Sequence, residues 1–78
     1  MSKKLIKEDE LLKMVRAKMV TSEECSGYEV NIVPWHKTDK RGRNWEVGIV
    51  RRGKHVIGVS RILRMVEELQ DKYELKRH

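Results

Sequence analysis

The 78-residue sequence predicts a small α+β domain in which two helices pack on one face of a two- or three-stranded antiparallel sheet. Near both ends of the chain, apolar residues recur every three to four positions, which is typical of helices with one buried face. Between these stretches they recur at every second position, as in strands. The expected order is helix, strand, strand, a possible third strand and helix. We expect a single domain over residues 1–78, with an ordered core of about 7–75.

The first helix is expected over about residues 7–19. Its buried face would be formed by Leu12, Val15 and Met19. Glu8, Asp9 and Glu10 lie at its N-terminus, where the helix dipole favours negative charge. The segment "TSEECSG" that follows is expected to form a turn or a single helical turn.

Two strands are expected over about residues 28–33 and 44–50. The side chains that would face the helices are those of Tyr28, Val30, Ile32, Trp45, Val47 and Ile49. Pro34 has no backbone N–H, so it ends the first strand or places that strand at a sheet edge. Trp45 alternates in phase with apolar neighbours, and we therefore interpret it as a core residue rather than a base-stacking platform.

The segment "HVIGV", residues 55–59, could form a short third strand after a tight turn at Gly53. Ser60 is a natural N-cap for a second helix over about residues 61–73. The apolar stripe of this helix would consist of Ile62, Val66, Leu69 and Tyr73.

Most of the net charge of +6 lies between His36 and His55. The basic residues of this segment are Lys37, Lys40, Arg41, Arg43, Arg51, Arg52 and Lys54, against only Asp39 and Glu46. If the two strands pair, the loop and the turn that carry these residues lie at opposite ends, roughly 20 Å apart at ~3.3 Å per residue. That separation suits contacts along a nucleic-acid backbone better than one phosphate pocket. Alternatively, these residues only keep turns and sheet edges soluble.

Trp35 follows Pro34 and opens the basic loop. Its indole either caps the edge of the core or lies partly exposed, where it could stack on a base, an arginine or a peptide side chain. Trp35 is therefore the candidate aromatic contact beside the basic residues.

Catalytic and metal sites are not indicated. Cys25, His36, His55 and His78 lack the spacing of zinc ligands, and the single glycines form no phosphate-binding loop. A Cys25–His36 pair would have no third residue to orient it. We therefore expect no enzyme activity, no metal and no small-molecule cofactor.

Cysteine usage and hydropathy bear on location. A single cysteine fits a reducing compartment, and the N-terminus has no apolar segment of the signal-peptide kind. No apolar run approaches the ~20 residues that span a bilayer. We expect a cytoplasmic protein without a membrane partner.

Several short landmarks resemble a group of small uncharacterised bacterial proteins, mostly from proteobacteria and their mobile elements. They are Cys25 followed by a strand, the Asn44–Trp45 pair, and the ending "LQDKYEL" with Leu69, Tyr73 and Leu75. The resemblance covers about residues 23–75 and implies a small α+β domain without an assigned activity.

The order of elements also resembles the double-stranded-RNA-binding domain. The lysine-rich start of that domain's second helix is absent here, because "SRILRM" offers only Arg61 and Arg64. This likeness concerns the fold alone.

The charge distribution predicts a non-catalytic protein that binds an anionic surface, with a nucleic-acid backbone favoured. The alternative is a protein-interaction module, such as a regulator or a phage-type antagonist, whose basic strip docks on an acidic partner.

Overall fold

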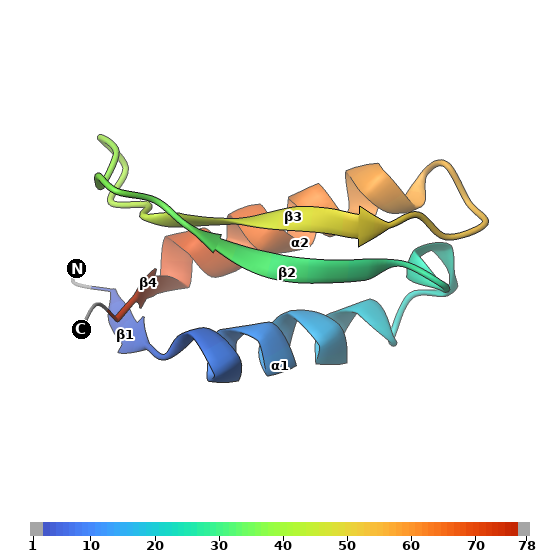
Figure 1. The fold of residues 1–78 in the computed structure, drawn as a ribbon, viewed down its shortest axis with the longest axis horizontal. Coiled ribbons are helices and arrows are strands. Elements are labelled where there is room, and N and C mark those ends of the chain that lie inside the picture. The colour runs from blue at the N-terminus through green and yellow to red at the C-terminus, as the bar shows by residue number, and fades with distance from the viewer. Residues whose placement is uncertain (1–2, 77–78) are drawn as a thin grey trace.

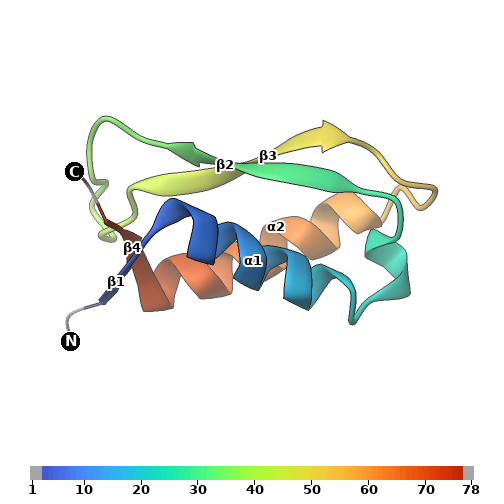
Figure 2. The ribbon, with the colours of Figure 1, turned by 60° about the horizontal axis from the view of Figure 1, so that its bottom comes forward.

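The computed structural model describes residues 3–76, and this part of the chain forms two helices, a short 3-10 turn and four strands. In chain order these are β1 (Lys4–Ile6), α1 (Glu8–Met19), η1 (Glu23–Cys25), β2 (Glu29–Pro34), β3 (Trp45–Arg51), α2 (Gly58–Lys72) and β4 (Tyr73–Leu75). Both helices lie on the same side of the β2–β3 hairpin (Figures 1 and 2). The predicted α+β class is confirmed.

The β2–β3 hairpin is antiparallel, as expected, with Val30 opposite Ile49 and Ile32 opposite Val47. α1 packs against β2, and α2 packs against β3. The side chains predicted to face the helices are buried, except Ile49, which is half-buried. The opposite face of the hairpin meets solvent.

The expected third strand over residues 55–59 is wrong. His55 to Ile57 form a turn, and α2 begins at Gly58, so Ser60 lies in the first helical turn and not at the N-cap. The N–H of Gly58 donates to the carbonyl of His55 at 3.0 Å, a contact between residues three apart that leads into the helix. Val56 and Ile57 are exposed in the turn, whereas Val59 lies in the first turn of α2 and packs against the core.

The sheet is also not purely antiparallel, because β1 and β4 form a separate parallel pair. Ile6 lies opposite Leu75 in this pair, and the two termini meet at one end of the molecule (Figure 1). α2 therefore ends at Lys72, and Tyr73, which was expected on the helix stripe, begins β4. The predicted order of elements is corrected by the addition of a strand at each end.

One apolar cluster joins both helices, the hairpin and the parallel pair. Its fully buried side chains are those of Trp45, Leu11, Ile62 and Val15. On α1 the buried face is formed by Leu11, Val15 and Met19, whereas Leu12, which was expected there, is half-buried. The spacing of four residues keeps Leu11 and Val15 on one helix face. Within residues 3–76, neither helix is long and apolar enough to cross a bilayer.

Candidate nucleic-acid interface

The basic segment is divided between the two ends of the hairpin. The loop between β2 and β3 carries Lys37, Lys40, Arg41 and Arg43, which we call the loop end. The chain at the end of β3 carries Arg51, Arg52 and Lys54, which we call the turn end. The hairpin runs along the longest dimension of the molecule, which is 35 Å, with one group at each extremity (Figure 1).

The loop end is organised around the carboxylate of Asp39. The backbone N–H groups of Arg41 and Arg43 donate to Asp39 Oδ1 at 3.0 and 2.8 Å. The N–H of Gly42 donates to the Asp39 carbonyl at 3.0 Å, and Gly42 has a φ of +80°, a conformation that glycine adopts without strain. Asp39 therefore closes a tight turn through both its side chain and its backbone.

Arg43 completes this turn. Its guanidinium Nε donates to Asp39 Oδ2 at 2.6 Å, and both side chains are about three-quarters buried, with exposures of 27 and 28%. Burial tends to raise the pKa of Asp39, but the hydrogen bonds and charge of Arg43, with the N–H of Arg41, hold that pKa below its ordinary value of 3.8. Arg43, a predicted anion contact, already has an internal anionic partner.

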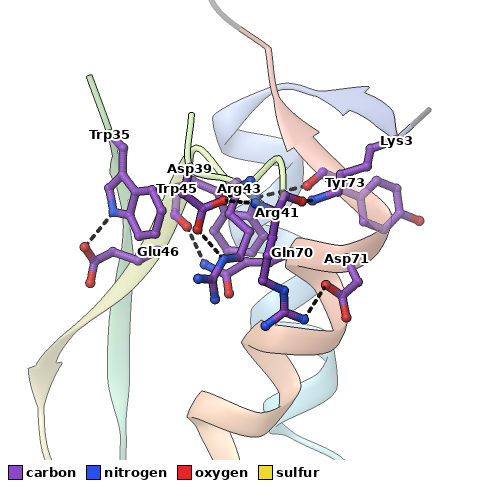
Figure 3. A network of polar contacts seen from close by, with 10 residues as sticks. All are labelled: Lys3, Trp35, Asp39, Arg41, Arg43, Trp45, Glu46, Gln70, Asp71 and Tyr73. Atoms are coloured by element: carbon purple, nitrogen blue, oxygen red, sulfur yellow. Dashed lines mark hydrogen bonds and ion pairs between the residues drawn. The ribbon is translucent and has the colours of Figure 1, made fainter. Parts of the chain in front are cut away.

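Arg41 is held more loosely. Its guanidinium lies 3.4 Å from the carboxylate of Asp71 on α2, and both side chains are more than half exposed. The carbonyl of Arg41 accepts a hydrogen bond from Lys3 Nζ at 2.8 Å (Figure 3). The position of Lys3 at this end was not predicted, because it follows from the pairing of β1 with β4.

Asn44 and Trp45 attach the loop end to the core. Asn44 is 2% exposed, and its side-chain amide exchanges two hydrogen bonds with the backbone of Leu75, at 2.9 and 2.8 Å. The indole N–H of Trp45 donates to the Tyr73 carbonyl at 3.2 Å, and Gln70 donates to the Trp45 carbonyl at 2.5 Å (Figure 3). These hydrogen bonds join the Asn44–Trp45 pair to Tyr73 and Leu75 of the C-terminal landmark, so these residues stabilise the fold.

Trp35 lies beside the loop end and is half-buried. Its indole N–H donates to Glu46 Oε2 at 2.6 Å, and the guanidinium carbon of Arg43 lies 6.0 Å from the ring centroid (Figure 3). This is the outer limit of a cation–π contact. Trp35 also lines a groove with Lys7, His36 and Lys76, and its ring is partly exposed near an arginine.

The turn end is held in place mainly by contacts of two glycines with Tyr28, and most of its cations take no part in them. Gly53 and Gly58 lie against the ring of Tyr28, whose hydroxyl donates to the His55 carbonyl. A Cβ atom on Gly53 would lie 2.0 Å from the carbonyl oxygen of Ser26, and one on Gly58 would lie 2.4 Å from that of Glu24. Glycine is therefore required at both positions, and the turn is fixed on η1 and the start of β2.

The cations of the two ends differ in their partners. Arg51 pairs with Glu29 across the hairpin at 2.5 Å, although both side chains are more than half exposed. The other four cations of the basic segment are exposed and have no acidic partner within residues 3–76; we call them the open cations. They are Lys37 and Lys40 at the loop end, and Arg52 and Lys54 at the turn end.

Apolar side chains are exposed beside the turn end. Val56 is 86% exposed, Ile57 is 53% exposed and Val50 is 62% exposed. The sequence prediction missed this feature because it assigned residues 55–59 to a strand. On the solvent face of the hairpin, the carboxylate of Glu29 lies at the turn end and that of Glu46 lies beside the loop end.

Within residues 3–76, no three His, Cys, Asp or Glu side chains lie together as potential metal ligands, and His78 lies outside this range. Cys25 is buried in the core cluster. No protein-family model, curated protein or solved structure matches this chain.

Proposed function

We propose that this protein is a non-catalytic cytoplasmic module that binds the phosphate backbone of a nucleic acid. The observation that carries the proposal is the set of open cations, whose charge no acidic side chain of the described residues neutralises. Charge of this kind attracts phosphates and releases the counterions condensed around them.

Arg41 and Arg51 would add to these contacts. Their ion pairs with Asp71 and Glu29 are exposed, and exposed pairs contribute only ~0–1 kcal/mol to stability. A phosphate can therefore take the place of the carboxylate at little cost. Arg43 instead supports the loop and lies near the ring of Trp35, which is the proposed aromatic contact.

The position of the acidic residues restricts the path of the ligand. Glu29 lies opposite Arg51 at the turn end, and Glu46 accepts a hydrogen bond from Trp35 beside the loop end. Each carboxylate repels phosphates near one of the two ends, so a backbone that contacts Arg51 would have to displace Glu29.

A salt titration tests the proposal. Fluorescence anisotropy with labelled DNA and RNA, single-stranded and duplex, should show binding at ~50 mM salt that weakens steeply as salt rises. Each phosphate contact on duplex DNA should contribute about −0.9 to the slope of log affinity against log salt, and slightly less on a single strand. Absence of binding to every one of these probes at low salt would overturn the proposal.

An acidic protein partner is the second candidate, and the exposed apolar residues beside the turn end favour it. Protein interfaces combine apolar centres with polar rims, as would a surface built from Val56, Ile57 and Arg52. Purification of the tagged protein from its host with and without nuclease separates the two candidates. A nuclease-sensitive partner supports the nucleic-acid proposal, and an acidic protein that remains bound supports the second.

A further inference from the structure

Val56 and Ile57 form an apolar tip at the turn end. Seven large hydrophobic residues within residues 3–76 are strongly exposed, and these two are the only pair adjacent in the chain. Single exposed hydrophobic residues are ordinary, whereas neighbouring ones at an extremity of the molecule suggest a contact surface.

The tip is held in place by its surroundings. On one side Gly53 lies against the ring of Tyr28, and on the other Gly58 lies against the same ring and the Glu24 carbonyl. The hydroxyl of Tyr28 donates to the carbonyl of His55, immediately before Val56. Because both flanks are anchored, the backbone of the tip is held in place, and a partner has less ordering cost to overcome.

The charge around the tip is positive. From Val47 to Val66 the sequence contains no acidic residue, and Arg52 and Lys54 lie just before the tip as open cations. Glu29 and Glu24 come from other elements and pair with Arg51 and Arg61, at positions outside the tip itself. The partner that complements this surface is therefore anionic and offers a narrow apolar recess.

We propose that the tip enters the minor groove of duplex DNA, with Arg52 and Lys54 on the flanking phosphates. This inference rests on the proposed function and specifies its ligand. A minor groove ~6 Å wide admits two aliphatic side chains. Aliphatic wedges beside basic residues are the means by which minor-groove proteins unstack a base step and bend the duplex. Protein hot spots instead favour Trp, Tyr and Arg over Val.

The test replaces the apolar tip and leaves the charge unchanged. The variant Val56→Ser/Ile57→Ser should bind duplex DNA about tenfold more weakly at every salt concentration, because apolar burial is lost. Its salt slope should stay as in the wild type, since the phosphate contacts remain. Affinity for a single strand should be unchanged. Duplexes labelled at both ends should report bending by energy transfer with the wild type and not with the variant.

Val20→Ser is the matched control, because Val20 is 84% exposed just after α1 and is not part of the tip. It should bind and bend the duplex as the wild type does. If the double variant loses stability in a thermal melt, the single change Val56→Ser, at the more exposed position, replaces it in the same comparison.

The possible failures are distinguishable. Equal duplex affinity and bending for wild type and tip variant would overturn the minor-groove inference while nucleic-acid binding stands. If the wild type binds no nucleic acid but binds phosphatidylserine vesicles through the tip, both proposals are wrong. If it binds neither nucleic acid nor vesicles, both proposals are also wrong.

Discussion

The two ends of the hairpin carry similar charge but use it differently. At the loop end, Arg43 is half-buried against Asp39, and Asn44 is tied to the last strand. At the turn end, Arg52 and Lys54 point into solvent beside an exposed apolar tip. The loop end therefore contributes to the stability of the fold, whereas Arg52 and Lys54 at the turn end have no acidic partner among the described residues. Counting basic residues in a segment does not reveal this difference, because a charge that is paired internally is not available to a ligand.

The largest loss of stability is expected from a substitution where the loop end joins the core. Trp45→Ala should unfold or nearly unfold the protein, because Trp45 is fully buried and deletion of a buried tryptophan costs ~3–5 kcal/mol. Small domains have little more stability than this. A urea melt followed by circular dichroism measures the loss. A midpoint close to that of the wild type would show that the loop end is not anchored by this residue.

A smaller loss of stability is expected when the anchoring of the turn end is disturbed. Gly53→Ala places a methyl group against the Ser26 carbonyl and the Tyr28 ring, and such overpacking costs ~1–3 kcal/mol. A decrease in the midpoint of thermal unfolding measures this loss of stability. Lys54→Ala, at an exposed neighbour, is the control and should leave the midpoint unchanged. Wild-type stability for Gly53→Ala would mean that the turn moves freely, and the tip would lose its fixed position.

A still smaller effect is a pH-dependent change at the loop end that the turn end should not share. The pKa of Asp39 is lowered in the folded protein, so its contribution to stability is complete above the ordinary value of 3.8 and is lost as pH falls through the folded value. The amide NMR signals of Arg41 and Arg43 should therefore change below about pH 4. The Lys54 amide at the turn end should not follow this transition. If the Lys54 amide signal changed over the same pH range as those of Arg41 and Arg43, the two ends would not be independent of each other.

The sequence allowed prediction of those parts whose patterns are local. Helical and alternating periodicity placed both helices and the hairpin, and the phase of Trp45 identified it as a core residue. The β1–β4 pair could not be predicted, because each strand has three residues, too few to show alternation, and the partners lie at opposite ends of the chain. The roles of Arg43 and Asn44 depend on that pair and on the turn at Asp39. Val56 and Ile57 were misassigned because five residues suit a strand and an exposed turn equally well.

The most direct test of the difference between the ends compares two variants of equal charge. Arg52→Gln/Lys54→Gln changes the turn end, and Arg41→Gln/Arg43→Gln changes the loop end. In a salt titration on duplex DNA, the turn-end variant should flatten the log–log slope by about 1.8, at ~0.9 per lost phosphate contact, with an unchanged thermal midpoint. The loop-end variant should lower the midpoint, because it breaks the Arg43–Asp39 pair, and should flatten the slope less. Equal flattening by both variants, or more by the loop-end variant, would contradict the account.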